Sequence, residues 1–311
     1  MTTKRVDEPI LVIGFNRPDH LSILIDRLRE VRPTNLYFAI DGPRAGKAGE
    51  REKVEACHNL VKAIDWECHV QTNFQQENLG CGQGVSTAIT WFFDHVERGI
   101  ILEDDIIPVP SFFGFCSELL DRYEVDDRVF AISGCNFVPP EHQSHPHEAY
   151  RFSQIPHIWG WATWRRSWLQ HKLDIAGWTR RLPPHRLWAR SGHSIPGSVY
   201  WAGMFELLAR KQIDTWDGQL VLASMVTGGL TATSNVTLIQ NIGFDDQATH
   251  TRVDRHDLPE PQAIELPTRP VQVVLDSKAD AWTRKHHFRA TWPGMFAQAK
   301  TYLRGKVRVG S

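Results

Sequence analysis

The first 135 residues alternate between short apolar runs and segments of helical periodicity, and this alternation constrains the fold most strongly. The first run is Ile10–Ile13, and an apolar stripe from Leu21 to Val31 predicts a helix. Pro18 suits the first turn of that helix, where no backbone N–H is needed. The pattern then repeats, predicting strands at residues 36–40, 68–72, 100–102 and 129–133, and helices at 54–64, 85–96 and 112–123.

Strands joined by connections of helical length predict a mostly parallel central sheet with helices on both faces, an α/β fold. Ligands of such sheets bind at the carboxyl ends of the strands. Polar clusters follow three of the predicted strands, so we expect them to converge on one crevice. These clusters are Asn16-Arg17, Asp41-Gly42 and Glu103-Asp104-Asp105.

The second half is less regular. Residues 136–157 are rich in proline and histidine and predict a loop, and residues 159–216 are rich in aromatic side chains. We expect one domain over residues 1–258, divided into halves at residues 1–135 and 136–258. Residues 259–311 are predicted to form an extended proline-rich segment followed by a basic C-terminal helix.

Charge and cysteine content narrow the class of protein. The formal net charge is -1, and no basic stripe in the main body indicates a nucleic-acid partner. The five cysteines are odd in number and none are spaced as CxxC, which predicts reduced thiols in a reducing compartment. The polar N-terminus lacks the apolar stretch of a signal peptide. We therefore expect a cytoplasmic protein.

Residues 282–308 combine aromatic and basic side chains. Such a segment suits peripheral contact with an anionic membrane on its inner face, where lipid-linked acceptors reside. The alternative is a helix packed on the sheet with a solvated basic face. Pro293 and Gly294 would break a long amphipathic helix, which favours the packed alternative.

Three consecutive carboxylates follow the apolar run Ile100–Leu102. Their mutual repulsion is relieved either by a divalent cation or by a solvated turn. Mg²⁺ and Mn²⁺ prefer oxygen ligands, and one or two carboxylates completed by diphosphate oxygens are a common arrangement. The alternative is an acidic first turn of the helix that begins near Pro110. Their position at the end of a strand, near two other polar strand ends, favours a metal site.

Two other phosphate-binding patterns are absent. A dinucleotide fold needs G-x-G-x-x-G after the first strand, whereas this chain has Gly14-Phe15-Asn16-Arg17-Pro18 there. The glycine-rich segment Gly80–Gly84 opens the third helix and lacks the Lys-Ser/Thr ending of a P-loop. It could still let a backbone approach a phosphate or the metal.

The segment Ile101–Ile106, followed by Val109–Phe113, resembles the metal-binding segment of the Golgi N-acetylglucosaminyltransferase family that initiates hybrid and complex N-glycans. Similar segments occur in bacterial glycosyltransferase-like proteins of capsule and lipopolysaccharide gene sets. Ordered similarities extend over about residues 10–251. They include Asn16-Arg17, Ile40-Asp41-Gly42, Leu79-Gly80 with Gln83, Trp159-Gly160-Trp161, Trp216-Asp217 and Gly243–His250.

The resemblance implies a GT-A fold, a UDP-sugar donor, Mn²⁺ (or Mg²⁺) and inversion at the anomeric carbon. It implies that residues 1–135 bind the nucleotide sugar and that residues 136–258 bind the acceptor. By the same resemblance, Asp105 would ligate the metal, Asp104 would lie against the ribose and the metal's waters, and Glu103 would face the donor sugar. Asp41 would accept a hydrogen bond from uracil, and Arg17 would lie near the nucleotide.

The catalytic base is where the sequence departs from the family pattern. The family has two aspartates after the tryptophan, and this chain has Asp217 followed by Gly218. Asp217 is the candidate base, and its alternative role is a helix N-cap. Asp214 and the pair Asp245-Asp246 are further candidates.

Other candidates have two roles each. His250 is a candidate second metal ligand or phosphate donor, although a lone histidine is more often a packed or surface side chain. Trp159, Trp161 and Trp201 are candidates for stacking on acceptor sugars, or else for packing in the core.

The sequence thus predicts a metal-dependent glycosyltransferase that moves N-acetylglucosamine or a hexose to a glycan or lipid-linked glycan in surface polysaccharide or glycoconjugate synthesis. One alternative is a non-catalytic carbohydrate-binding relic of the fold, which Gly218 favours. A sugar nucleotidyltransferase is a further alternative, but it should show a glycine- and lysine-rich loop after the first strand, and this chain has none.

Overall fold

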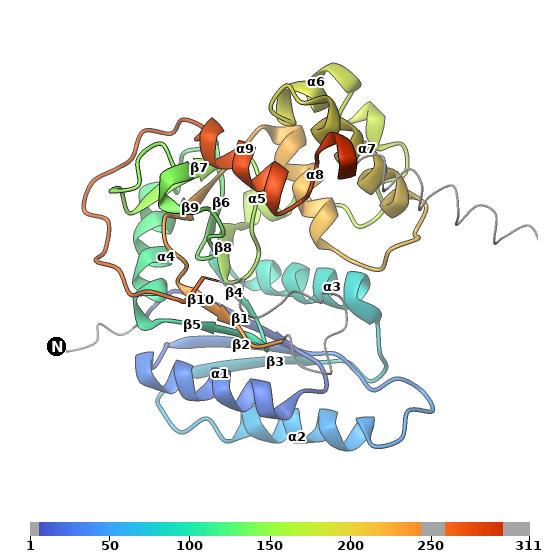
Figure 1. Ribbon diagram of the computed structural model, residues 1–311. Coiled ribbons are helices and arrows are strands. Elements are labelled where there is room, and N and C mark those ends of the chain that lie inside the picture. Colours follow the sequence, from blue (N-terminus) through green and yellow to red (C-terminus); the bar gives the residue numbers. More distant parts are fainter. Residues whose placement is uncertain (1–5, 244–258, 295–311) are drawn as a thin grey trace, which may run out of the picture.

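An eight-stranded sheet forms the centre of the molecule in the computed structural model, which describes residues 6–243 and 259–294. The strand order is β3-β2-β1-β4-β8-β6-β9-β7, and β5 and β10 form a small separate sheet (Figure 1). The strands are β1 Ile10–Gly14, β2 Asn35–Ile40, β3 His69–Phe74, β4 Arg98–Glu103, β5 Ile106–Pro108, β6 Val129–Ser133, β7 Tyr150–Ser153, β8 Trp161–Trp164, β9 Leu230–Ser234 and β10 Ile239–Asn241.

Most strands of the large sheet run in one direction. The neighbours β3, β2, β1 and β4 pair in parallel, and so do β6 and β9. Strand β8 pairs antiparallel with both β4 and β6, and β7 pairs antiparallel with β9. The predicted α/β class with a mostly parallel central sheet is therefore confirmed.

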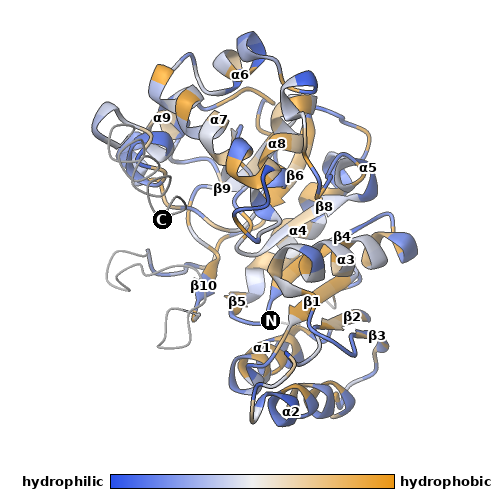
Figure 2. Cartoon of the chain, turned by 90° about the vertical axis from the view of Figure 1, so that its right-hand side faces the viewer, coloured by the Kyte–Doolittle hydropathy of each residue, from blue (hydrophilic) through white to orange (hydrophobic). Residues whose placement is uncertain are grey.

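Helices cover both faces of this sheet, as predicted. Along β1, Ile10 and Val12 pack in one apolar cluster with α1, α2 and α4, whereas Leu11 and Ile13 pack in a second cluster with α3, α5 and α8. In Figure 2 the central strands β1 and β4 are coloured as hydrophobic, whereas α1 and α2 carry both hydrophobic and hydrophilic residues. The helices are α1 Pro18–Val31, α2 Glu50–Lys62, α3 Gly80–His95, α4 Pro110–Arg122, α5 Arg165–Trp168, α6 Pro184–Arg190, α7 Ile195–Ala209, α8 Asp217–Thr227 and α9 Ser277–His286.

The prediction of a loop over residues 136–157 is wrong at β7. This strand has only four residues, and both of its faces are buried. Arg151 is buried there because its guanidinium donates to the backbone oxygen of Ser234 and to the side-chain oxygens of Asn235 and Asn136. Because the strand is short and one of its buried residues is an arginine, its sequence lacks the continuous apolar run that would predict a buried strand.

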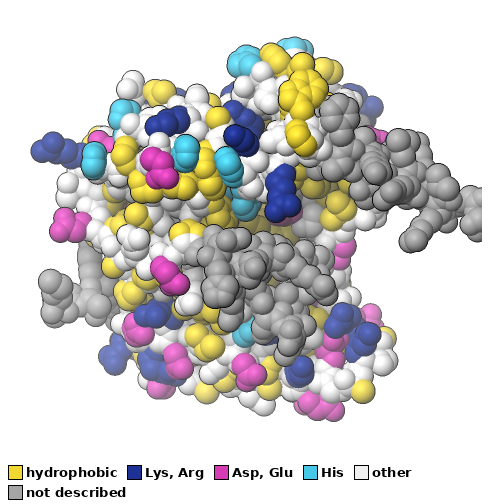
Figure 3. Space-filling model, viewed as in Figure 1, with side chains coloured by type: hydrophobic (Ala, Val, Ile, Leu, Met, Phe, Trp, Pro, Cys, Tyr) yellow, Lys and Arg dark blue, Asp and Glu magenta, His cyan; other side chains and the backbone are white. Residues whose placement is uncertain are grey.

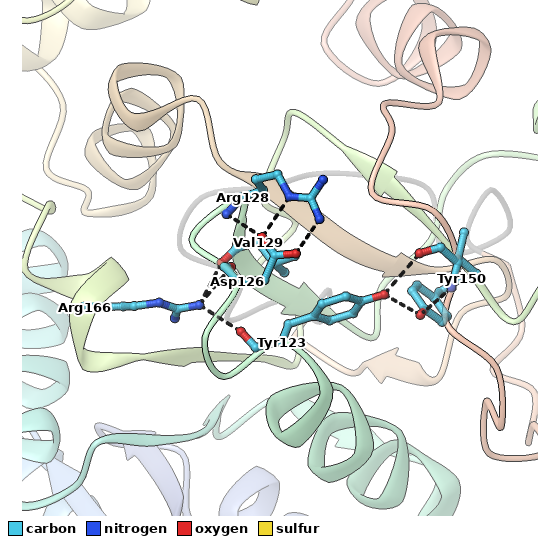
Figure 4. Close-up of polar contacts among 7 residues, drawn as sticks. Tyr123, Asp126, Arg128, Val129, Tyr150 and Arg166 are labelled. Atoms are coloured by element: carbon cyan, nitrogen blue, oxygen red, sulfur yellow. Dashed lines mark hydrogen bonds and ion pairs between the residues drawn. The ribbon is translucent and has the colours of Figure 1, made fainter.

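Strand β8 lies between β4 and β6 although it follows both in the chain. Arg166, just after β8, donates to the carbonyl oxygens of Tyr123, Asp126 and Val129 at 3.0, 3.2 and 3.4 Å (Figure 4). Its guanidinium also lies 4.1 Å from the ring centroid of Trp164. These contacts fix the end of β8 to the turn that precedes β6.

The C-terminal segment packs on the edge of the sheet. Residues 259–276 run without a helix to α9. Asp280 of α9 accepts from the Ser153 hydroxyl at 2.6 Å and from the Gln154 backbone N–H at 2.9 Å. Phe288, after α9, packs against Trp201, with ring centroids 5.1 Å apart. This packing favours the packed alternative for residues 282–294 over membrane contact, and residues 295–308 lie outside the described residues.

Within the described part of the chain, no helix is both long and apolar enough to cross a bilayer. On the face shown in Figure 3, basic and acidic side chains of the described residues are interspersed. All five cysteines are free thiols, and Cys57, Cys116 and Cys135 are buried.

Candidate active site

The carboxyl ends of β1, β2 and β4 open into one pocket of about 1060 Å³. The second half of the chain closes the pocket with Trp159, the segment 214–217 and Asn241 with Gly243. The three predicted polar clusters therefore converge, as parallel strand ends on one sheet edge require. The pocket is lined by Asn16 and Arg17 after β1, Asp41 after β2, and Glu103, Asp104 and Asp105 at the end of β4.

Arg17 bridges two of the three consecutive carboxylates. Its Nη1 donates to Asp105 Oδ2 at 2.9 Å, and its Nη2 forms a short ion pair with Asp104 Oδ1. Burial opposes the charge on Arg17, but Asp104 and Asp105 outweigh it and raise the arginine's pKa above its ordinary value. Arg17 thus partly neutralises the triplet and holds both side chains in place.

Asp104 keeps one oxygen unsatisfied. The residue is 1% exposed, and Oδ2 has no hydrogen-bond partner among the described residues. Burial raises the pKa of Asp104, and Arg17 opposes that rise. A buried acceptor without a partner costs free energy, so it marks a place where a donor or a cation would be stabilised.

The residues present fit a hard divalent cation. Asp105 lines the pocket beside Asp104, and carboxylate oxygens are the ligands that such cations prefer. In residues 6–243 and 259–294, no group of three or more His, Cys, Asp or Glu side chains could hold a metal. A metal bound here would therefore need further oxygen ligands, from water or from a diphosphate. His250 lies outside the described residues.

The acidic triplet is not the first turn of a helix. Strand β5 follows it, and α4 begins only at Pro110. The backbone of Asp105 accepts from the Ile242 N–H at 2.9 Å, next to the pairing of β5 with β10. The acidic-turn alternative is therefore wrong, because a two-stranded sheet separates these carboxylates from the helix.

Glu103 lies at the end of β4, next to β1, and lines the pocket. Burial, and then the charges of Asp105 and Asp104, raise the pKa of Glu103 above its usual range. The charge of Asp217 makes a smaller contribution to this rise in pKa.

Asp41 binds the N-terminal end of α3. Its Oδ1 accepts from the backbone N–H groups of Gly42 and Leu79, both at 2.9 Å, and its Oδ2 accepts from Asn78 Nδ2 at 2.8 Å. The Leu79 N–H also reaches Oδ2 at 3.2 Å, so the protein itself takes most of the roughly four acceptor positions of this carboxylate. Burial raises the pKa of Asp41, and these backbone hydrogen bonds oppose the rise.

Asp217 is exposed at the first residue of α8 and lines the pocket. Its Oδ1 accepts from the Thr215 hydroxyl at 2.5 Å and from the Gly218 N–H at 2.7 Å. The N-cap of α8 is Trp216, so Asp217 does not hold the N-cap position. Gly218 is buried, and a Cβ there would lie 2.5 Å from Leu208 Cδ1. The Cβ of a side chain at position 218 would thus point toward the apolar cluster around α7.

The three candidate tryptophans have different surroundings. Trp159 lines the pocket and is partly buried. Trp161 is 1% exposed and stacks on Trp216, with ring centroids 5.7 Å apart. Trp201 is 3% exposed and stacks on Phe205 at 5.7 Å. Burial favours the core-packing alternative for Trp161 and Trp201. Of the three, Trp159 alone remains a candidate for stacking on an acceptor sugar.

Sequence reasoning missed the basic wall of the pocket. The Arg44 guanidinium donates to Glu50, which is 5% exposed, and lies 5.5 Å from the Phe15 ring centroid. Lys47 and Lys53 line the same side. No periodic pattern marks this wall, because Arg44 and Lys47 belong to the connection before α2; only the charged residues that follow the Asp-Gly-Pro turn could have indicated it.

No protein-family model matches the chain. Among solved structures, a Pyrobaculum calidifontis mannosyltransferase in complex with GDP-Man and Mn²⁺ is 16% identical with a TM-score of 0.35; the match covers 57% of this chain and 47% of that one. A UDP-glucose pyrophosphorylase complexed with UDP-glucose is 9% identical with a TM-score of 0.39 and coverages of 73% and 90%. The bifunctional glycosyltransferase WbbM is 8% identical with a TM-score of 0.33 and coverages of 73% and 38%.

The chain thus spans about half the length of the mannosyltransferase and less of WbbM. The highest of these three TM-scores is 0.39, so we base the functional proposal on the residues of the pocket.

Proposed function

We propose that this chain is a metal-dependent glycosyltransferase that moves a hexose or N-acetylglucosamine from a UDP-sugar to a glycan acceptor, with inversion. One observation carries the proposal: Asp104 and Asp105 lie at the end of β4 in the same pocket as Asp41, with one buried oxygen of Asp104 free of any partner among the described residues. The resemblance of the acidic segment to a metal-binding segment supports the choice of donor.

In this proposal the nucleotide half binds and orients the donor. Asp41 accepts from the nucleobase, Asp105 ligates the cation, and Asp104 lies against the ribose and the metal's waters, with Arg17 keeping both of these aspartates in place. The bound cation would neutralise the charge that develops on the leaving nucleotide diphosphate. Arg44, Lys47 and Lys53 add positive charge to the lining of the pocket, which favours an anionic ligand.

Asp217 is the proposed general base. Inversion requires the acceptor hydroxyl to attack the anomeric carbon from the face opposite the diphosphate, and a carboxylate must take the hydroxyl proton at hydrogen-bond distance. Asp217 is exposed in the pocket, on the wall formed by the second half of the chain. Trp159 would offer an apolar ring to the acceptor sugar.

A second candidate function is carbohydrate or nucleotide-sugar binding without turnover. Gly218, in place of the family's second aspartate, favours it. Such a relic would bind the nucleotide as the enzyme does and would differ only in lacking turnover.

Calorimetric titration of UDP with and without Mn²⁺ tests the donor site, with GDP as the competing nucleotide. We expect UDP binding that requires Mn²⁺ and weakens at least tenfold in Asp105→Asn. Asp94→Asn, an exposed aspartate of α3 outside the pocket, is the matched control and should bind like the wild type. UDP binding that ignores both the metal and Asp105 would disprove the metal assignment. Turnover of UDP-sugars then separates the enzyme from the relic.

A further inference from the structure

The N-terminal end of α3 is held by two aspartates from opposite halves of the chain. Asp41, after β2, accepts from the Leu79 N–H at 2.9 Å. Asp214, in the segment before α8, accepts from the Cys81 N–H at 3.1 Å and from the Gly82 N–H at 2.9 Å. The first N–H groups of a helix have no partner within the helix, and the positive end of its dipole attracts anions.

Asp214 therefore takes the place that a phosphate takes at many helix N-termini. The glycines of this segment leave room for it. Gly80 has a φ of +78°, and a Cβ at Gly82 would lie 2.7 Å from Asp214 Oδ1 and 3.0 Å from the Thr215 carbonyl oxygen. The Cys81 and Gly82 amides of the glycine-rich segment thus serve a contact within the protein.

The residues that follow Asp214 are held as well. Trp216 is 2% exposed, stacks on Trp161, and its carbonyl oxygen lies 3.1 Å from His171 Nε2. Thr215 donates to Asp217 Oδ1. Asp217 is thus the exposed end of a short segment that is fixed at Asp214 and at Trp216, and it lines the pocket.

We propose that Asp214 is a positioning residue for Asp217: it anchors the segment 214–217 on the N-terminus of α3 and so fixes the proposed base in the pocket. This inference rests on the proposed function. Asp214 itself lines the pocket, and each of its oxygens accepts only one backbone N–H, so the pH–rate profile must distinguish positioning from base catalysis. Arg17 holds Asp104 and Asp105 separately from this anchor, whereas Asp41 shares the N-terminal end of α3 with Asp214 through the Leu79 N–H.

The test compares Asp214→Ala, Asp214→Asn and Gly82→Ala with the wild type. Loss of the anchor should lower kcat for UDP-sugar turnover about 10²-fold in Asp214→Ala, because misplacing a reacting group by about 1 Å costs that much. Asp214→Asn keeps one acceptor oxygen and should recover part of the rate. Gly82→Ala keeps Asp214 but pushes it away, so it should lower kcat even if Asp214→Ala fails to fold. The affinity for UDP with Mn²⁺ and the KM for the donor should change less than threefold.

Hydrogen exchange supplies a measurement that does not depend on turnover. In Asp214→Ala the Cys81 and Gly82 amides, and the peptide covering residues 211–220, should exchange faster. Faster exchange with an unchanged kcat would overturn the positioning role. Equal loss of activity in Asp214→Ala and Asp214→Asn, with the acidic limb of the pH–rate profile removed, would instead make Asp214 the base. If the wild type binds UDP but turns over no donor, both the proposed enzymatic function and the positioning role of Asp214 are wrong. Hydrogen exchange would still report whether Asp214 anchors the segment 214–217 on α3.

Discussion

The two halves of the molecule build the pocket in different ways. In the first half, Arg17, Asp41 and Asp105 each follow a strand of the parallel set β2-β1-β4, so parallel pairing brings all three to one edge of the sheet. In the second half, the pocket residues lie on connections or at the ends of α8 and β10, and the conspicuous side chains Trp161 and Trp201 are buried. The comparison teaches that residue type predicts a binding role only where the secondary structure already places the residue at the pocket, as at the ends of the parallel strands.

The largest effect should come from Asp217→Asn, which tests whether the second half supplies chemistry as well as shape. We expect kcat to fall about 10²–10⁴-fold, the usual contribution of a general base. UDP affinity and the unfolding temperature should stay unchanged, because Asp217 is exposed. Kinetics and calorimetry on the same preparation check this. An undiminished kcat would transfer the role to another pocket carboxylate, with Glu103 the next to substitute.

Substituting the tryptophans distinguishes a core role from a pocket role. Trp161→Ala should lower the free energy of unfolding by about 3–5 kcal/mol, because it removes a buried ring that packs on Trp216. Trp159→Ala should cost less stability and mainly weaken ligand binding. Trp292, 51% exposed, supplies the control substitution Trp292→Ala, with an expected change of about 0.5 kcal/mol or less. Urea unfolding gives all three values, and similar losses for Trp159 and Trp161 would remove the distinction.

Gly218→Asp introduces the second aspartate of the family pattern and tests whether an aspartate at that position is enough to raise turnover. We expect no gain in kcat and a loss of stability of about 2–3 kcal/mol, because the side chain would meet Leu208 and bury a charge. Gly218→Ala separates volume from charge and should cost less, since Leu208 Cδ1 is the far end of a flexible side chain. An increase in turnover for the aspartate variant would show that position 218 reaches the pocket after all.

The smallest effect concerns pH. His157 is 7% exposed, and burial, with the nearby charges of His287 and Arg151, lowers its pKa well below the ordinary value. A histidine with a lowered folded-state pKa contributes stability above about pH 6.5 that is lost as the pH falls toward that folded pKa. The slope from this one group is at most about 1.4 kcal/mol per pH unit.

His157→Phe should therefore flatten the dependence of unfolding free energy on pH below about 6.5. His147→Gln, at an exposed position, is the control and should leave the slope unchanged. Denaturant unfolding at several pH values measures it, and an unaltered slope in His157→Phe would show that this histidine does not set the acid sensitivity.

Much of the first half could be predicted because its signals are local. The apolar stripe from Leu21 to Val31 and Pro18 at the first helical position identify α1, and the apolar run before Glu103 identifies β4. The convergence of the polar strand ends followed from parallel pairing alone. The role of Asp214 could not be predicted, because its partners Cys81 and Gly82 lie more than 130 residues away in the chain.

By itself, the sequence determined the fold class and the position of the acidic triplet at the end of a buried strand, since hydrophobic periodicity and chain direction act over a few residues. Only the tertiary structure decided that β8 enters between β4 and β6, that Trp161 and Trp201 are core residues, and that Asp214 binds the end of α3. These outcomes depend on contacts between distant segments. Which contacts form is settled by burying apolar surface and satisfying backbone groups across the whole molecule at once.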